Sequence, residues 1–357
     1  MRKHTIGFAE NSNFQIKDNA MIRPFISILF LAYFGCTQMA AQASFRVAFY
    51  NVENLFDTLD DPNNPRDNEF TPSGRLNWTP ERYQQKLDNI EQVIATLNYP
   101  AILGLSEVEN RKVLNDLTQH KGTATQNYGI VHIESPDYRG IDVALLYDST
   151  LFTVTRIDTI RFTIPKEIVE EYTGRDILEV EAVYQQTDTL LFFVNHWPSR
   201  SGGLQKTEGR RLYTAAKLRA RLNQRLANQP KRKVILMGDF NDEPDNASVA
   251  SILGILPKGS TPMDGLFYNC LTDLDRQKQG SYNYRGNWNM IDQIMSSAAL
   301  IRTDAPLKIV KAGVLKEDFM LYKDPKFGKR PSRTYGGPNY YGGYSDHLPV
   351  YIDLAKE

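Results

Sequence analysis

The residues of this chain that could do chemistry are acids, amides and histidines that follow or precede apolar, strand-like segments. Asp346 and His347 stand together just before an apolar run near the C-terminus, and the chain has only five histidines. Asp239 and Asn241 come directly after an apolar segment that ends in glycine. Sheets often present reactive groups in the loops at the ends of their strands. We therefore expect these four side chains to gather at one edge of a sheet.

Five further polar residues hold the same kind of position, and all could meet at one rim of a sheet sandwich. Carboxylates, carboxamides and imidazoles, without cysteine ligands, an HExxH helix or a glycine-rich phosphate loop, fit a hard divalent cation. Mg²⁺ is the expected ion, with Mn²⁺ as the alternative, because Mg²⁺ needs few carboxylates and accepts a substrate phosphate oxygen. Hydrolysis of a phosphate ester is the reaction such a set would serve. The five residues are Asn51, Glu53, Glu107, His196 and Asp292.

Six short motifs resemble, in order and spacing, those of the endonuclease/exonuclease/phosphatase family. That family includes pancreatic-type deoxyribonucleases, abasic-site endonucleases, neutral sphingomyelinases and inositol polyphosphate 5-phosphatases. The resemblance covers about residues 45–355, and it is specific because six motifs occur in the right order. The motifs are Phe49–Asn54, Leu105–Val108, Asn195–Ser199, Gly238–Asn241, Ile291–Asp292 and Ser345–His347.

The resemblance implies a metal site. Glu107 matches the family's principal metal-binding glutamate, and Asn51 matches the residue that supports it. Glu53 stands where some members have a second acidic ligand, and Asp346 matches an acidic residue near the metal. Glu109, by contrast, is expected to be a surface residue.

The resemblance also implies catalytic roles. Asp239 matches the residue that orients or deprotonates the attacking water, and Asn241 matches an amide donor to the phosphoryl oxygen. His347 matches a phosphate-contacting or acid–base histidine that Asp292 orients, and a buried carboxylate there would keep the imidazole protonated near neutral pH. His196 matches a second histidine that faces the scissile phosphate and can protonate the leaving group. His120 and His132 lack such a context and are read as ordinary histidines.

Basic residues near these motifs are candidates for contact with substrate phosphate, because guanidinium groups suit phosphate oxygens. Arg200, Lys206 and Arg211 lie in and after a glycine-containing loop, and Arg139 precedes a strand-like segment. For each of the first three, a solvated surface position is an equally good interpretation. The Gly- and Tyr-rich stretch 335–344 could stack on bases or sugars, or could be a structural loop.

The apolar patterning predicts ten strands and two clear helices. The helix at 81–97 has six apolar residues on one face after Thr79-Pro80, and the helix at 208–227 repeats leucine at four-residue spacing. Adjacent strands without an intervening helix indicate mixed sheets, so we predict an α/β fold: a four-layer sandwich of two mixed β-sheets flanked by helices. Segments 163–175 and 308–329 carry no interpretable motif and are expected to be loops. The predicted strands are 45–51, 101–106, 128–133, 141–147, 151–157, 177–185, 189–195, 233–238, 290–296 and 348–353.

Length and composition favour one large domain after a targeting segment. The 357 residues are 41% hydrophobic, which suits a single two-sheet domain over 44–357. Residues 1–43 are predicted to be a secretory signal, because an apolar run too short to span a membrane precedes an A-x-A cleavage pattern. Met21 is an alternative initiator that restores a short basic start. Lipid attachment at Cys36 is the rival interpretation.

Charge limits how the protein could hold a polyanion. The chain carries 42 basic and 42 acidic residues, so it lacks a global basic field for nucleic acid. Local arginines and a metal ion would therefore have to bind the phosphates of the polyanion. We expect a secreted or periplasmic monomer, without a stable protein partner or a membrane anchor in its mature form, that cuts the phosphodiester bonds of nucleic acid. The alternatives are a phospholipid or sugar-phosphate phosphoesterase, and a binding module without turnover.

Overall fold

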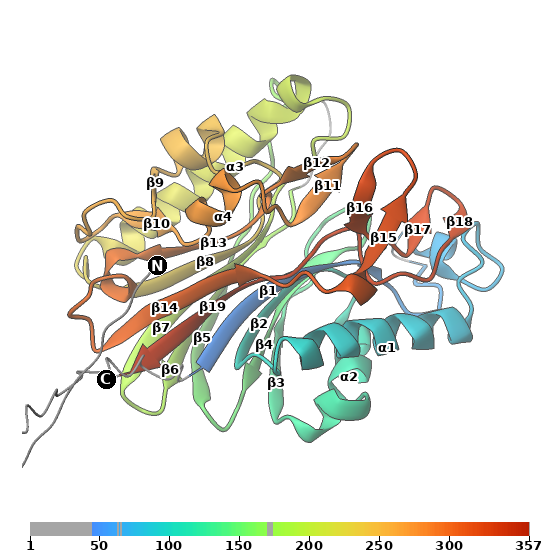
Figure 1. Ribbon diagram of the computed structural model, residues 1–357, viewed down its shortest axis with the longest axis horizontal. Coiled ribbons are helices and arrows are strands. Elements are labelled where there is room, and N and C mark those ends of the chain that lie inside the picture. The colour runs from blue at the N-terminus through green and yellow to red at the C-terminus, as the bar shows by residue number, and fades with distance from the viewer. Residues whose placement is uncertain (1–44, 63, 65, 170–173, 357) are drawn as a thin grey trace, which may run out of the picture. The chain divides into compact units, whose positions relative to one another are not determined.

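Two mixed β-sheets build the protein, as the computed structural model describes for residues 45–62, 64, 66–169 and 174–356 (Figure 1). None of the helices in this described part combines the length and the apolar character needed to cross a bilayer. The predicted signal segment, residues 1–43, lies outside the described residues. So do the alternative initiator Met21 and the lipid-attachment candidate Cys36, which are part of it.

The first sheet has six strands and is mixed, because one neighbouring pair is parallel and the others are antiparallel. Its strands come from both ends of the described chain. In spatial order they are β14 (Leu307–Val314), β19 (Val350–Lys356), β1 (Phe45–Leu55), β2 (Ile102–Val108), β4 (Asp142–Asp148) and β3 (Tyr128–His132).

The second sheet has seven strands and is also mixed. It is drawn from the middle of the chain. In spatial order its strands are β5 (Phe152–Ile160), β6 (Ile177–Tyr184), β7 (Asp188–His196), β8 (Lys233–Asp239), β13 (Asp292–Ser297), β10 (Phe267–Asn269) and β9 (Ile255–Pro257).

Two central parallel pairs position the functional residues. β1 runs parallel to β2 in the first sheet, and β7 runs parallel to β8 in the second. These pairs pack against each other across the sandwich. Parallel neighbours end at the same edge of a sheet, so Glu107 at the end of β2 and Asp239 at the end of β8 are brought to a common rim.

Within residues 45–356, as far as the structure describes them, four α-helices accompany the sheets, and two of them match the predicted ones. In the first, the Thr79 side chain accepts a hydrogen bond from the backbone N–H of Arg82, which caps the helix start ahead of a proline. This cap places the start one residue before the predicted position. The helices are α1 (Pro80–Thr96), α2 (Arg111–Thr118), α3 (Leu204–Leu226) and α4 (Thr272–Arg276).

Apolar side chains join these elements into four layers. Phe49 and Val194 belong to the core between the two sheets. α1 and α2 cover the outer face of the first sheet, where Leu87 is buried, and α3 covers the outer face of the second, where Leu218 is buried (Figure 1). The predicted four-layer sandwich of two mixed sheets flanked by helices is therefore confirmed.

The prediction of loops over 308–329 was wrong. Most of its first part lies in β14, an edge strand of the first sheet, and the rest contains the hairpin of β15 (Leu321–Asp324) and β16 (Gly328–Pro331). The pairing of β14 with β19 shifts register between Ile309 and Lys311. A bulge breaks the two-residue alternation, and the exposed lysines of an edge strand hide the remaining pattern.

Short hairpins and short helical turns complete the fold. Two more hairpins are two-stranded antiparallel sheets like β15–β16, and short helical turns connect the larger elements. The hairpins are β11 (Tyr282–Tyr284) with β12 (Asn287–Asn289), and β17 (Tyr335–Gly336) with β18 (Asn339–Tyr340); the turns are Asp67–Phe70, Lys121–Thr125, Ser248–Ile252, Ala298–Leu300 and Asp318–Met320.

Candidate active site

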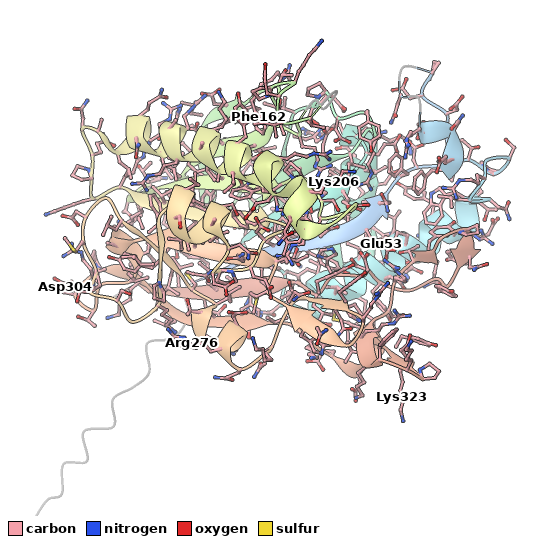
Figure 2. All side chains as sticks on the ribbon, turned by 90° about the horizontal axis from the view of Figure 1, so that it is seen from above. Glu53, Phe162, Lys206, Arg276, Asp304 and Lys323 are labelled. Atoms are coloured by element: carbon pink, nitrogen blue, oxygen red, sulfur yellow. The ribbon has the colours of Figure 1, made fainter. Side chains whose placement is uncertain are left out.

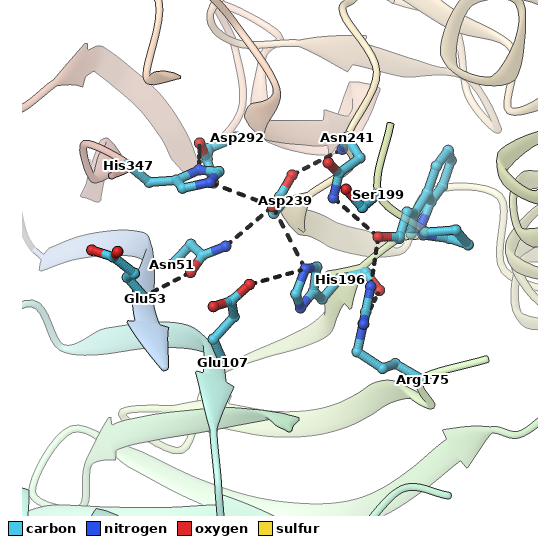
Figure 3. Close-up of polar contacts among 12 residues, drawn as sticks. Asn51, Glu53, Glu107, Arg175, His196, Ser199, Asp239, Asn241, Asp292 and His347 are labelled. Carbon is cyan, nitrogen blue, oxygen red and sulfur yellow. Dashed lines mark hydrogen bonds and ion pairs between the residues drawn. The ribbon is translucent and has the colours of Figure 1, made fainter. Parts of the chain in front are cut away.

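One cleft of about 1000 Å³ brings the predicted catalytic and metal-binding residues together (Figure 3). Asn51 and Asp292 lie beneath its surface, where each contacts a residue that lines the cleft. The separated motifs of the sequence therefore form one site. The predicted residues that line the cleft are Glu53, Glu107, His196, Asp239, Asn241, Asp346 and His347.

The parallel pairing of β7 with β8 fixes His196 beside Asp239, its register partner. Gly238 makes this pairing possible, because a Cβ at that position would lie 2.3 Å from the carbonyl oxygen of Asn195. The backbone N–H of Trp197 then donates to the carbonyl of Asp239 over 2.9 Å. Buried Trp197 also donates from its indole to Asn195 Oδ1 over 3.1 Å, which holds the Asn-His-Trp motif in place.

Left-handed backbone conformations aim several site residues at the cleft. Glu53, Asn54, Glu107 and Asn241 have φ values of 51°, 55°, 62° and 50°. The first three lie where the pairing of β1 with β2 shifts register, so they are the residues of an irregular bulge. Non-glycine residues adopt this conformation rarely and at some energetic cost. Its concentration at one rim indicates that the geometry of the site, rather than regular pairing, fixes these positions.

His347 and Asp292 form a buried hydrogen-bonded pair. Nδ1 of His347 lies 2.7 Å from Oδ2 of Asp292, and Nε2 lies 3.9 Å from Oδ2 of Asp239. Burial alone would lower the pKa of His347, but the carboxylates of Asp292, Asp239 and Asp346 outweigh it and hold that pKa well above its usual value. His347 is therefore a cation at neutral pH, as predicted from the Asp292 contact.

His196 has the opposite electrostatic character. Its Nε2 lies 3.7 Å from Oδ2 of Asp239 and 3.8 Å from Oε1 of Glu107. Burial and the charge of Arg175 hold the pKa of His196 well below its usual value. The imidazole is thus neutral at rest and can donate a hydrogen bond, and its role in protonating the leaving group stays a prediction.

Asp239 sits at the centre of these contacts. Its Oδ1 accepts the backbone N–H of Asn241 over 2.9 Å, and its Oδ2 accepts Nδ2 of Asn51 over 3.1 Å. Burial and the neighbouring charge of Asp292 raise the pKa of Asp239 to about 7. The Asn241 side chain donates to the carbonyl of Trp197 over 3.0 Å, which leaves its second amide hydrogen for another acceptor.

A second carboxylate group lies on the other wall of the cleft. Glu53 accepts the backbone N–H of Thr334 over 2.6 Å, and burial together with the charge of Asp346 raises the pKa of Glu53 to about 7. Arg333 donates to Asp346 over 2.6 Å. Burial works against ionisation of Asp346, but His347 and Arg333 hold its pKa below the usual value.

These residues fit a hard divalent cation. Glu107 accepts the backbone N–H of Asn54 on Oε2 over 3.1 Å, whereas its Oε1 lies 3.8 Å from His196 Nε2. Two carboxylates, Glu53 and Asp239, have raised pKa values, first because they are buried and second because other carboxylates lie nearby. A cation among these oxygens would balance their negative charge.

A different carboxylate and imidazole group also meets the distance requirement for a metal. Ligand atoms of Asp239, Asp292 and His347 lie within 4.8 Å of one another. Because Nδ1 of His347 is already hydrogen-bonded to Asp292, we assign this group to proton handling and not to metal binding. The oxygen set around Glu107 is the better cation site.

The four predicted phosphate-contacting residues differ in their placement. Arg139 lines the cleft, donates to Asn54 Oδ1 over 2.8 Å and lies 3.7 Å from Glu107. Arg200 lines the cleft too, but its guanidinium donates to the carbonyl of Asn241 and to Asn246. It therefore shapes the loop after β8 and is only partly available to a substrate.

Lys206 takes the solvated position that was the alternative interpretation, and Arg211 takes neither predicted position. Lys206 is exposed on the first turn of α3, outside the residues that line the cleft (Figure 2). Arg211 is fully buried, and its Nε lies 2.8 Å from Oδ1 of Asp242. The ion pair with Asp242 explains why Arg211 is buried. The sequence did not predict it, because no local pattern indicates that Asp242 points inward toward the helix. Arg211 supports the fold of the site and cannot reach a substrate.

Glu109 is a further correction, since it was expected at the surface. It is buried and accepts the backbone N–H of Asp57 over 2.7 Å. Burial raises the pKa of Glu109 to about 8. His120 and His132, read as ordinary, pair with Asp88 and Asp142 respectively.

Sequence reasoning missed three supporting cations. Lys86 of α1 is buried and donates to Thr334 Oγ1 over 2.6 Å and to the carbonyl of Tyr344 over 2.8 Å. Arg175 donates to the carbonyls of His196 and Trp197 (Figure 3). The third is Arg333. None belongs to a recognisable motif; the one available signal was a lysine on the apolar face of the helix that follows Thr79-Pro80.

The chain also matches a described protein family. The sequence fits the Endonuclease/Exonuclease/phosphatase family over residues 46–356. The chain belongs to this family. The predicted family and the predicted enzyme class, a hydrolase of phosphate ester bonds, are thus confirmed. Members of the family depend on divalent metal ions, in keeping with the oxygen set described above. No curated protein sequence matches this member at a significant level.

Solved structures with the same fold include enzymes of several kinds. One is a Bacteroides thetaiotaomicron mannosyl-6-phosphatase, with a TM-score of 0.53 at 17% identity over 87% of this chain and 100% of that chain. Another is D. rerio TDP2 in complex with a single-strand DNA product, with a TM-score of 0.52 at 17% identity over 87% and 99%. A third is the human Nocturnin catalytic domain with bound sulfate, with a TM-score of 0.51 at 16% identity over 88% and 94%. At such low identity these similarities establish the fold of this family member.

Proposed function

We propose that this phosphoesterase is a secreted, Mg²⁺-dependent phosphodiesterase that cuts nucleic acid. The observation that carries the proposal is the convergence of His347 and His196 on the central Asp239, each with Nε2 within 4 Å of its carboxylate. A diester carries one negative charge at the phosphate. One cationic and one neutral imidazole suit that charge better than two cations would.

The walls of the cleft support a polymeric or nucleotide substrate. Phe56 and Phe70 stack with ring centroids 4.0 Å apart, and both line the cleft together with Tyr335. Arg66 and Arg75 line the same wall. Aromatic faces and guanidinium groups together suit bases and backbone phosphates. Tyr335 of the 335–344 stretch belongs to this aromatic wall, and stacking of its ring on substrate is part of the proposal.

In the proposed mechanism, Asp239 orients the attacking water and accepts its proton, which a pKa near 7 suits. His347 holds positive charge against the phosphoryl oxygens, and the free amide hydrogen of Asn241 donates to them. His196 donates a hydrogen bond to the leaving oxygen. Mg²⁺, held by Glu107 with Asn51, Glu53 and Asp346 around it, would polarise the phosphoryl group and stabilise developing charge when bound.

The test is hydrolysis by purified residues 44–357 with Mg²⁺. Single-stranded DNA, duplex DNA, RNA and bis(p-nitrophenyl) phosphate form the substrate panel, each with and without chelator. We expect strand cleavage that chelator abolishes and that an Asp239→Asn variant lowers by about 10³-fold. If the wild type leaves all four substrates intact, the proposed function is wrong.

A sugar-phosphate or phospholipid phosphoesterase is the second candidate. The balance of 42 basic and 42 acidic residues favours it, because many nucleic-acid enzymes carry a net positive charge. The fold shared with a mannosyl-6-phosphatase is compatible with it. Release of inorganic phosphate from mannose 6-phosphate, or of phosphocholine from sphingomyelin, in place of strand cleavage would favour this candidate.

Secretion is proposed from the sequence pattern of residues 1–43. Mass spectrometry of the protein from its native host would place the mature N-terminus. A start near residue 44 supports a cleaved signal, and a lipid-modified Cys36 at the N-terminus supports an anchored form. We also propose a monomer, which the native mass in solution tests.

A further inference from the structure

A second, smaller cavity of about 160 Å³ lies beside the catalytic cleft. The hairpins β11–β12 and β15–β16 lie side by side and contribute its walls (Figure 1). We call this cavity the hairpin pocket. It shares Tyr282, Tyr284, Arg333 and Asp346 with the cleft. A group bound in the hairpin pocket would therefore be adjacent to the group undergoing hydrolysis.

The hairpin pocket is positively charged. Arg285, Arg330 and Arg333 line it, and Asp346 is the one carboxylate among its lining residues. Arg333 pairs with Asp346, and Arg330 lies 2.8 Å from Asp324. Arg285 is exposed, lies 5.1 Å from the Tyr284 ring and has no carboxylate within ion-pair distance in the described part of the chain. The guanidinium of Arg285 is therefore available to a ligand.

Asn283 adds a buried donor to this pocket. Only 8% of the residue is exposed, and its Oδ1 accepts the backbone N–H of Gly286 over 3.0 Å. This contact fixes the amide, so Nδ2 is left buried without a hydrogen-bond partner in the described structure. Buried donors without acceptors are costly and rare in native proteins. An acceptor supplied by a ligand would remove that cost.

The turn between β11 and β12 holds the donors in place. Arg285 and Gly286 both have positive φ, at 52° and 91°, which is the geometry of a tight two-residue hairpin turn. Phe327 and Tyr282 add apolar surface beside the charged groups. A pocket with guanidinium forks, an amide donor and flat apolar walls suits a phosphate group attached to a sugar or base.

We propose that the hairpin pocket binds a second phosphate group, the one next to the phosphate that is hydrolysed. The substrate would then be held at two phosphates, as a polynucleotide or a terminally phosphorylated oligonucleotide offers. The identity of this substrate rests on the proposed function. Anion binding by the hairpin pocket does not.

Phosphate binding tests the pocket without reference to any reaction. Equilibrium dialysis of the Mg²⁺-loaded protein against inorganic phosphate should give two phosphates per chain in the wild type. Arg285→Gln removes the free guanidinium, and Asn283→Asp keeps the acceptor for Gly286 while replacing the donor with a negative charge. Each variant should weaken the second site by about tenfold or more. The control is Lys323→Gln, on the neighbouring hairpin β15–β16 but outside the pocket lining (Figure 2).

The outcomes are decisive in either direction. Loss of the second phosphate in both pocket variants, with two retained in Lys323→Gln, supports the inference. One phosphate per chain in the wild type, or the same second-site affinity in Arg285→Gln as in the wild type, overturns it. Thermal denaturation of each variant checks that the hairpin stays folded.

A dinucleotide pair then tests the role in substrate choice. Dithymidine monophosphate has a single phosphodiester, and the same dinucleotide with an added 5′- or 3′-terminal phosphate has a second anion. The wild type should show kcat/KM about tenfold higher for one of the phosphorylated forms. Arg285→Gln should bring this ratio close to one without changing kcat/KM for the unphosphorylated dinucleotide. A ratio unchanged by Arg285→Gln would overturn this role. If no dinucleotide is cleaved, the proposed function fails, while phosphate binding still decides the pocket.

Discussion

The carboxylate of Asp292 lies 2.7 Å from Nδ1 of His347, and Ser281 donates to the same carboxylate oxygen over 2.6 Å. All three side chains are buried. The pair therefore acts as one unit, in which Asp292 fixes the orientation of the imidazole and favours its charged form. The protonation state of His347 should set the alkaline limit of activity.

Asp292→Asn tests that relationship. His347 has a raised pKa and is needed as a cation, so activity is present below that pKa and is lost as pH rises through it. Asn keeps the shape but removes the charge, so the alkaline limb of the kcat/KM profile should move to lower pH by about one unit or more, with about a 100-fold loss of kcat. The measurement is a pH–rate profile on bis(p-nitrophenyl) phosphate.

Ser281→Ala is the matched control for this prediction. It removes a hydrogen bond from the same carboxylate oxygen but leaves the charge of Asp292 in place. Its alkaline limb should stay near that of the wild type. An unshifted profile in Asp292→Asn would show that another group sets the alkaline limit.

Glu107→Gln tests the metal site by direct binding. The substitution keeps the size of the side chain and removes the charge that the cation would meet, so Mn²⁺ affinity should fall by about 10- to 100-fold and Mg²⁺-dependent activity should fall with it. Electron paramagnetic resonance of added Mn²⁺ measures the binding. Glu109→Gln is the control, because buried Glu109 contacts the Asp57 backbone and not the cleft. Equal Mn²⁺ affinity in Glu107→Gln and the wild type would rule out the assigned site.

The convergence of the predicted site residues could be expected from the sequence because they follow the ends of strands. Glu107, His196 and Asp239 follow apolar segments whose parallel pairing forces them to one rim. What could not be predicted was the direction of charged side chains away from the motifs. Lys86 and Arg211 look like solvated helix residues, yet both are buried. Lys86 contacts Thr334, which is distant in sequence, and Arg211 contacts Asp242, which points inward from a loop.

The same limit explains the errors in secondary structure. The long central strands are buried on both faces and give continuous apolar runs, which are easily found. β14 is an edge strand with a register shift and exposed lysines, so its pattern resembles a loop. The hairpins that form the hairpin pocket are short and polar. Their positions depend on contacts with each other, which local sequence patterns do not record.

Lys86→Met tests whether a buried lysine outside the cleft stabilises the segment that contacts the site. Lys86 joins α1 to Thr334 and to the carbonyl of Tyr344, in the segment that also carries the contact from Thr334 to Glu53. Loss of two buried hydrogen bonds should lower the free energy of unfolding by about 1–3 kcal/mol and reduce kcat by about tenfold. Urea denaturation and steady-state kinetics measure the two effects. Lys231→Met, at an exposed loop position, should change neither. Unaltered stability in Lys86→Met would mean that the segment is held without it.

Arg211→Met tests whether Arg211 stabilises the fold or binds substrate. The buried guanidinium balances Asp242, so its removal leaves that carboxylate with the longer 3.5 Å contact to Arg200 and should cost up to about 3–5 kcal/mol of folding free energy. KM for oligonucleotides should change little in the folded enzyme, because Arg211 does not line the cleft. The double variant Arg211→Met/Asp242→Leu should recover part of the stability, since both charges are then absent. Arg139→Gln should show the reverse pattern, with a raised KM and little change in the urea midpoint. A raised KM in Arg211→Met at full stability would restore it as a substrate contact.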